Sequence, residues 1–132
     1  MSNYIKLFLD DGIFEKDTIV KKRIIDEIFR PQVIFPVFGP PINNEFSSYG
    51  FGWWLTPING HKIIEHSGGI DGMAADVILV KDLNLGVVTL TNTDEIAPVL
   101  LNFKILEQVF NDKSFNIYEK WKKNRDESIN QK

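Results

Sequence analysis

The chain contains no cysteine in its 132 residues, which excludes disulfide bonds, thiolate metal sites and a cysteine nucleophile. Without cysteine usage as a guide, the redox compartment and the localisation are not readable from these residues. Histidine is also scarce. His61 and His66 are five residues apart across a turn and a strand, a spacing that does not place two imidazoles on one helix face as a zinc motif requires. We therefore expect no metal and no other cofactor.

The chain also lacks an excess of positive charge and a long hydrophobic run. Its net charge of -3 argues against a nucleic-acid partner, which would require a clustered basic face. No apolar run reaches the roughly 20 residues of a membrane span. The apolar start is interrupted by Lys6 and closed by Asp10 and Asp11, unlike a signal peptide. We expect a chain that is soluble as given, although a full-length protein could be periplasmic or extracytoplasmic.

Helical spacing of apolar residues predicts three helices. The first runs from Ser2 or Asn3 and ends at Gly12, and the second spans about Lys21–Phe29. The last begins at Thr93 or Asp94, accepts Pro98 in its first turn and carries an apolar stripe that can cover one sheet face. The polar residues 113–132 form either a short docking helix or a frayed end.

Strand signals fill the middle of the chain, while the proline-rich residues 31–48 predict an irregular connection. Pro57 with Asn59-Gly60 supplies the turn between the first two strands. The sequence predicts an α+β fold: an antiparallel meander of about three strands flanked by helices. The segments with strand character are Tyr49–Leu55, Lys62–His66, Met73–Lys81 and Val87–Asn92.

The stretch from 49 to 72 carries the most chemistry, because it sets aromatic residues, a hairpin and His66-Ser67-Gly68-Gly69 in immediate succession. Glycines in a strand let a substrate backbone approach closely, and exposed N–H groups there can bind an acyl group or its oxyanion. A plainer interpretation stands beside this one. His66 can be an ordinary strand-end histidine, and Gly68, Gly69 and Gly72 can serve only the turn between two strands.

Other residues of this region also have plain interpretations. Trp53 and Trp54 are typical of core packing, and at most one of them can face a cleft because successive strand residues point to opposite faces. Asp76 could orient a catalytic group or simply pair with a neighbour. We expect His61, Glu65 and Asp71 to be solvated surface residues.

The order of these parts resembles the C-terminal portion of the serine beta-lactamase and penicillin-binding protein family, and most of all its class C and esterase-like branch. The resemblance rests on a helix followed by Pro-Gln, then YGFGWW, a hairpin, HSGGIDG and DVILVKDLNLGVVTLTNTD. It implies that residues 1–112 form a partial beta-lactamase/transpeptidase-like fold and that 113–132 are a polar tail.

The resemblance also implies roles for individual residues. In this family a serine attacks an acyl group while a lysine or tyrosine handles its proton. The resemblance puts His66 at the lysine of the family's third motif, Ser67 at its threonine and Gly68 at its glycine, and it makes the Gly69 backbone N–H one oxyanion donor. A neutral imidazole has no permanent cation, so the resemblance does not extend to recognition of a beta-lactam carboxylate.

The family's first two motifs are missing from the chain. No serine is followed by lysine at the S-x-x-K spacing, no tyrosine by x-Asn, and the Ser-x-Asn triplets at Ser114 and Ser128 follow the third motif instead of preceding it. We therefore expect the C-terminal portion of a larger serine hydrolase that is inactive alone. A missing N-terminal part would be required before an ester, amide or peptidoglycan-type acyl substrate could react.

Two alternatives remain open. The chain could be a non-catalytic binding or self-association module that uses an exposed sheet edge, or one half of a split enzyme rebuilt from two chains. Because an open edge and an uncovered apolar sheet face favour association, we expect self-association or a swapped dimer.

Overall fold

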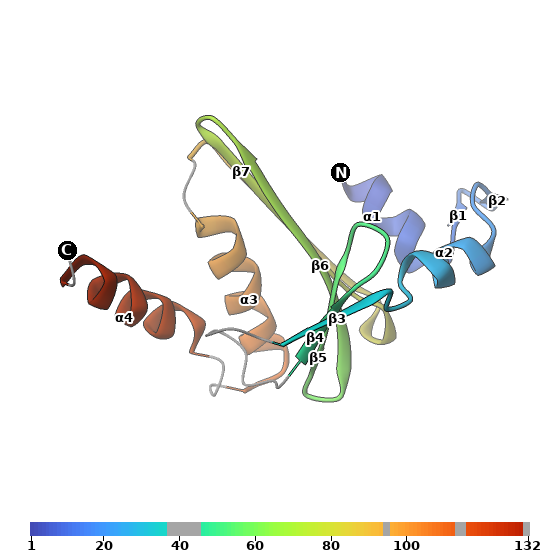
Figure 1. The fold of residues 1–132 in the computed structure, drawn as a ribbon. Helices are drawn as coiled ribbons and strands as arrows, with labels where there is room; N and C mark the ends of the chain where they lie inside the picture. Colours follow the sequence, from blue (N-terminus) through green and yellow to red (C-terminus); the bar gives the residue numbers. More distant parts are fainter. Residues whose placement is uncertain (37–45, 94–95, 113–115, 131–132) are drawn as a thin grey trace.

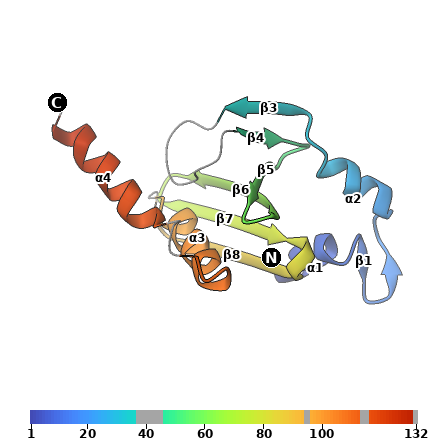
Figure 2. The same cartoon turned by 90° about the horizontal axis from the view of Figure 1, so that it is seen from below.

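The computed structural model describes residues 1–36, 46–93, 96–112 and 116–130 (Figure 1). In this part of the chain the main sheet has six antiparallel strands in the order β3-β4-β5-β6-β7-β8, so each strand pairs with the next along the sequence (Figure 2). The strands are β3 Val33–Pro36, β4 Phe46–Tyr49, β5 Trp54–Ile58, β6 His61–Ile70, β7 Met73–Val80 and β8 Leu85–Thr91. A small separate hairpin is formed by β1 Ile13–Phe14 and β2 Asp17–Thr18.

The first three helices cover the sheet on its two faces, and the fourth packs against the third. The helices are α1 Ser2–Leu9, α2 Lys22–Ile28, α3 Ala97–Val109 and α4 Ile117–Asn130, with a short 3-10 turn η1 at Lys81–Leu83. Side chains of successive strand residues point to opposite faces, so a sheet apolar on both faces needs two layers of cover. The first core, on the α1 and α2 face, contains Ile5, Phe8, Ile25, Phe29, Trp53, Leu55, Ile64, Val77 and Leu79. The second core, under α3, contains Ile58, Ile63, Ile78, Val80, Phe103 and Leu106.

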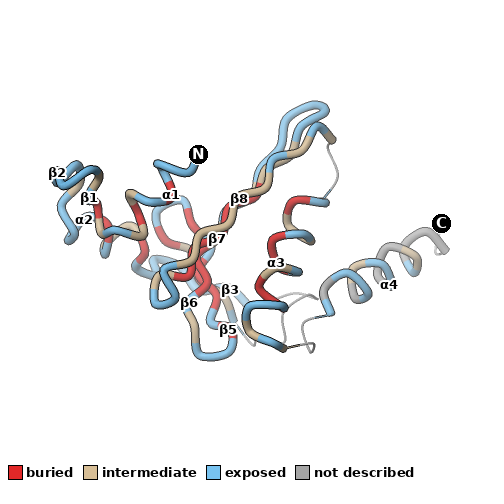
Figure 3. Tube along the Cα trace, turned by 180° about the vertical axis from the view of Figure 1, so that it is seen from behind, coloured by how far each residue is buried: buried red, intermediate tan, exposed pale blue. Residues whose placement is uncertain are grey.

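Figure 3 shows the buried stretches gathered where α1 meets the sheet and along α3. The outer end of the β6–β7 hairpin is exposed by contrast, with Ile70 at 71% and Met73 at 57% relative exposure. Among the described helices, none combines the length and the apolar composition that crossing a bilayer would take.

The predicted helices are confirmed, with shifted ends. α1 ends before Gly12, whose φ of +89° is typical of a helix stop, and its buried residues are Ile5 and Phe8 while Tyr4 stays exposed. α2 matches the predicted segment. α3 begins at Ala97, with Pro98 in its first turn, and it packs on β7 and β8. The tail is helical from Ile117 to Asn130, and the described side chains of this helix are mostly exposed.

The α+β meander is confirmed, but the sheet has six strands in the described residues instead of about three. The prediction of an irregular connection over 31–48 was wrong, because β3 and most of β4 lie inside that segment. Residues 37–45 fall outside the described part. β3 is an edge strand and Pro36 ends it, a position where a missing backbone N–H is tolerated.

The aromatic stretch predicted as one strand is two strands with a glycine-containing break between them. β4 ends at Tyr49 and β5 begins at Trp54. A Cβ on Gly50 would lie 2.5 Å from the Ile28 carbonyl oxygen, so only glycine lets the chain pass α2 here. The Asn59-Gly60 turn is confirmed by φ values of 51° and 81°, whereas Pro57 lies within β5 opposite Lys62.

Gly86→Ala should destabilise the fold, because an added Cβ at this position would lie 2.2 Å from Ile5 Cγ2 in the first core. Overpacking of a core typically costs about 1–3 kcal/mol in the free energy of unfolding. Urea denaturation measures this change. Gly68→Ala is the matched control, since its Cβ would meet no heavy atom within 4 Å; equal stability of the two variants would contradict the packing described for α1.

Candidate functional site

His66, Ser67, Gly68 and Gly69 lie within β6 and not beyond its end. β5 begins at Trp54, opposite Glu65, so no described strand pairs with β6 on that side from His66 onward (Figure 1). In an antiparallel pair, alternate residues direct both their N–H and C=O groups away from the partner strand. The half of β6 that carries the motif therefore offers backbone donors and acceptors at an edge that no described strand occupies.

The two glycines make this part of β6 accessible. A Cβ on Gly68 would meet nothing within 4 Å, and one on Gly69 would lie 3.1 Å from the Met73 carbonyl oxygen. A cavity of about 390 Å³ adjoins them and is lined by Gly68, Gly69, Ile70, Met73, Ala74, Ala75, Leu90 and Thr91. The turn itself uses Gly72, with φ at +77°, so the plain turn interpretation holds for Gly72 and not for Gly68 and Gly69.

The His66 side chain is exposed and is held by Tyr49. Its Nε2 lies 3.2 Å from the Tyr49 hydroxyl, just beyond the start of β5. The Tyr49 ring packs edge-on against Trp54, with ring centroids 4.8 Å apart. Tyr49 belongs to the YGFGWW stretch that the sequence singles out, but its position there gives no sign that it reaches a histidine seventeen residues later.

Behind the motif, a buried polar cluster joins β6, β7, β8 and α3. Asp76, which lies opposite Ser67, is only 1% exposed. Asn102 Nδ2 donates to Asp76 Oδ2 over 2.6 Å, and Thr89 Oγ1 donates to Asn102 Oδ1 over 2.5 Å. The Glu65 carboxyl lies within hydrogen-bonding reach of both Asp76 and Ser67. The plain interpretation of Asp76, pairing with a neighbour, is confirmed.

The two carboxyls of this cluster compete for one proton. Burial, followed by the hydrogen bond and charge of Asp76, raises the pKa of Glu65 to about 8. Burial also raises the pKa of Asp76, against the hydrogen bonds from Glu65 and Asn102 that favour its ionised form. Asp76 Oδ1 is buried and has no hydrogen-bond partner among the described residues, which adds to the cost of ionising Asp76.

The prediction that Glu65 and His61 are solvated surface residues was wrong. Glu65 is only partly exposed because β5 and β7 flank it on either side, and it belongs to the buried acid pair. His61 donates from Nδ1 to the Asp82 carboxylate and stacks on Phe110 at 4.9 Å with 4° between the rings. Asp71 is exposed as predicted.

Asn102 was missed by the sequence prediction. A polar residue inside the apolar stripe of a helix, one place before Phe103, was the available signal. Trp53 is 6% exposed and Trp54 is 38% exposed, which agrees with the prediction that at most one of them can face a cleft.

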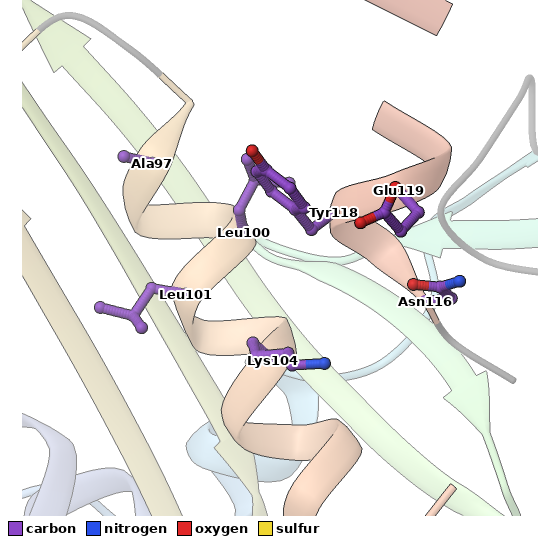
Figure 4. A pocket seen from close by; sticks show the side chains of 7 residues that line it. All are labelled: Ala97, Leu100, Leu101, Lys104, Asn116, Tyr118 and Glu119. Carbon is purple, nitrogen blue, oxygen red and sulfur yellow. The ribbon is translucent and has the colours of Figure 1, made fainter. Parts of the chain in front are cut away.

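Two further cavities lie away from His66. One of about 250 Å³ lies beside Ser67 toward the start of α3 and includes Ile96, Pro98 and Val99 in its lining. The other, of about 390 Å³, lies between α3 and the start of α4 (Figure 4) and is lined by Ala97, Leu100, Leu101, Lys104, Asn116, Tyr118 and Glu119. Within the described residues, no three acidic or imidazole side chains come close enough together to hold a metal ion.

These groups can bind and orient an acyl group, but they do not activate a nucleophile. The Glu65 carboxyl within hydrogen-bonding reach of Ser67 has its pKa raised to about 8 by burial and by Asp76, which disfavours the ionised form that a general base needs. What the open half of β6 supplies is a set of donors: the imidazole of His66, the hydroxyl of Ser67 and backbone N–H groups.

No family model matches the chain. It is 32% identical over 74 residues to unguisins hydrolase of Aspergillus violaceofuscus (strain CBS 115571), a match that covers 52% of this chain and 13% of that protein. It is 30% identical over 100 residues to the unguisins hydrolase of Aspergillus campestris (strain IBT 28561), covering 71% of this chain and 18% of that protein.

The fold is similar to that of the octameric penicillin-binding protein homologue from Pyrococcus abyssi. The TM-score is 0.71 at 19% sequence identity, and the match covers 86% of this chain and 24% of that one. The partial penicillin-binding-protein-like fold that the resemblance implied is thereby confirmed, and the names of the two relatives of similar sequence are consistent with a hydrolase family. The chain spans less than a quarter of each of the proteins that it matches.

The shared proton predicts that stability falls as the pH rises through neutrality. The pKa of Glu65 is about 8 in the fold against an ordinary 4.5, so between these values the folded chain keeps a proton that the unfolded chain releases. Its stabilising contribution is complete below about pH 4.5 and is lost as the pH rises through 8.

Urea unfolding between about pH 5 and 9 should show this decline in the native chain and a flatter profile in Glu65→Gln, which cannot lose a proton. Glu119→Gln, on an exposed part of α4, is the matched control and should keep the native slope. Identical slopes for the native chain and Glu65→Gln would show that the acid pair does not share a proton.

Proposed function

We propose that this chain is the C-terminal part of a beta-lactamase-like serine hydrolase, which forms an acyl-enzyme only when the remainder of the fold supplies the nucleophile. The observation that carries the proposal is the location of the HSGG motif on the half of β6 that pairs with β7 but with no other described strand, in a chain whose fold matches that of a penicillin-binding protein homologue over 86% of its length. The hydrolase relatives support the same reaction class.

In this proposal the residues of β6 act on the substrate as hydrogen-bond donors. The Gly69 N–H binds the oxyanion that forms when the missing serine attacks the acyl carbon, while Ser67 and His66 bind oxygens of the acyl substrate. One oxyanion donor typically stabilises the transition state by about 3 kcal/mol. In this proposal the proton of the attacking serine passes to a base that the remainder of the fold supplies.

The substrate class follows from the same geometry. An open strand edge beside two glycines suits an extended acyl group that pairs with β6 through its own backbone-like amide or ester atoms. We propose an ester, amide or peptidoglycan-type substrate. The names of the relatives support hydrolysis, and the neutral donor at His66 favours an uncharged carbonyl over a permanent anion.

The chain alone should not be acylated by a fluorescent penicillin or by a fluorophosphonate probe, since it contains no activated serine. Incubation followed by intact-mass measurement and gel fluorescence tests this, with a known serine hydrolase as the positive control. Stoichiometric labelling of the native chain that disappears in Ser67→Ala would contradict the proposal.

A second candidate function is self-association through the sheet edge, and the exposure of β3 favours it. All four residues of β3 are exposed, with Ile34 at 70% and Val33 at 50% relative exposure, and the strand carries no charge. Uncharged apolar edge strands pair readily with another strand, because their unpaired N–H and C=O groups form a template. We propose that two copies associate through β3.

Sedimentation velocity at micromolar concentration should show species larger than a monomer, and Ile34→Lys should shift the chain toward monomer by placing a charge on the edge. Ile19→Lys, at a residue of 60% exposure near β2, is the matched control and should leave the distribution unchanged. A native chain that sediments as a monomer would rule out association through β3.

A further inference from the structure

We propose that Tyr49 is a positioning residue for His66. Its hydroxyl holds Nε2 and so leaves Nδ1–H as the group that donates to the substrate. This inference rests on the proposed hydrolase function for its biological meaning, but the hydrogen-bond arrangement that it describes belongs to the chain alone.

The geometry of Tyr49 leaves it little freedom. Its backbone ends β4 opposite Trp54, and its ring packs against the Trp54 ring at 4.8 Å with 70° between the ring planes. Trp54 in turn packs edge-on against Phe35 of β3 at 5.6 Å. A row of three aromatic rings thus runs from the sheet edge toward β6 and fixes the direction of the phenol hydroxyl.

When the imidazole of His66 is neutral, only one direction of the hydrogen bond between it and the Tyr49 hydroxyl is favourable. A phenol is the stronger acid of the two donors, and an unprotonated ring nitrogen is a better acceptor than a phenol oxygen. Tyr49 therefore donates to Nε2 over the observed 3.2 Å. Because a neutral imidazole carries one proton, that proton must then sit on Nδ1.

As a consequence, His66 presents a hydrogen-bond donor, and not an acceptor, to a ligand. Among the described residues Nδ1 has no partner, and the His66 side chain is exposed, so Nδ1–H is free to donate. A neutral donor beside the open edge of β6 recognises an acceptor oxygen, such as the carbonyl of an ester or amide. Without Tyr49 the ring could adopt either tautomer, and the Nε2–H tautomer would place the unprotonated Nδ1 against that oxygen.

Nuclear magnetic resonance of the two histidines tests the proposal directly. Two-dimensional ¹H–¹⁵N spectra that correlate ring nitrogens with ring carbon-bound protons distinguish the tautomers, and His61 is the single other histidine of the chain. The spectra are recorded at about pH 8.5, roughly two units above the ordinary imidazole pKa. Parallel spectra of the Glu65→Gln variant exclude an effect of Glu65 ionisation, because the pKa of Glu65, about 8, lies close to this pH.

In the native chain, His66 should be predominantly the Nδ1–H tautomer. Tyr49→Phe, which keeps the ring and its packing, should convert His66 to a mixture of tautomers while the His61 signals stay in place. Tyr118→Phe on α4 is the matched control and should change neither histidine. Native His66 found as the Nε2–H tautomer, or an unchanged tautomer in Tyr49→Phe, would overturn the proposal.

These outcomes are separable from those of the proposed function. The tautomer of His66 is measured without substrate or nucleophile, so labelling of the isolated chain by an acyl probe would refute the fragment proposal and leave the tautomer result intact. Conversely, a tautomer unaffected by Tyr49 would remove the positioning role while His66 could still belong to a hydrolase cleft.

Discussion

The pairing of β6 with β7 is the constraint on which both cores and the candidate site depend. Seven consecutive residue pairs, from Ile64 with Leu79 to Ile70 with Met73, hold the two strands together. The half of this hairpin near β5 is buried between the helices, whereas the other half extends past β5 and carries the motif. One hairpin therefore supplies fully buried core residues, such as Ile78 and Leu79, and an exposed stretch of strand that carries the motif.

The acid pair shows how a hydrophobic sheet can accommodate carboxyl groups close to a cleft. An isolated buried carboxylate would be costly; here burial raises the pKa of both acids, and an amide donor from α3 reaches one oxygen of Asp76. The arrangement also ties α3 to the back of the strand that carries Ser67. Helix packing and site geometry are thus linked through Asn102 and not only through apolar contacts.

The fold class and the location of the motif could be predicted from the sequence, because both depend on patterns of residues that are close together in the chain. Helical apolar spacing identified α1, α2 and α3, and the Asn59-Gly60 turn placed β5 against β6. The sequence prediction missed β3 and β4, since prolines near an edge strand look like a loop when the pairing partner is unknown. It also missed the surroundings of Glu65, because the burial of a charged residue depends on strands and a helix distant in sequence. The hydrogen bond between Tyr49 and His66 was not predicted for the same reason, because the two residues are seventeen positions apart in the sequence.

The neighbouring residues Ile63 and Ile64 belong to different cores, on opposite faces of β6. A register slip of one residue would therefore exchange the two faces along the whole strand. Such a slip would also carry the Glu65 carboxyl away from Asp76 and into the aromatic core under α1, where no described partner could receive its proton or its charge. Only the observed alignment of β6 and β7 places the Glu65 carboxyl on the same face of the sheet as Asp76 and within its reach.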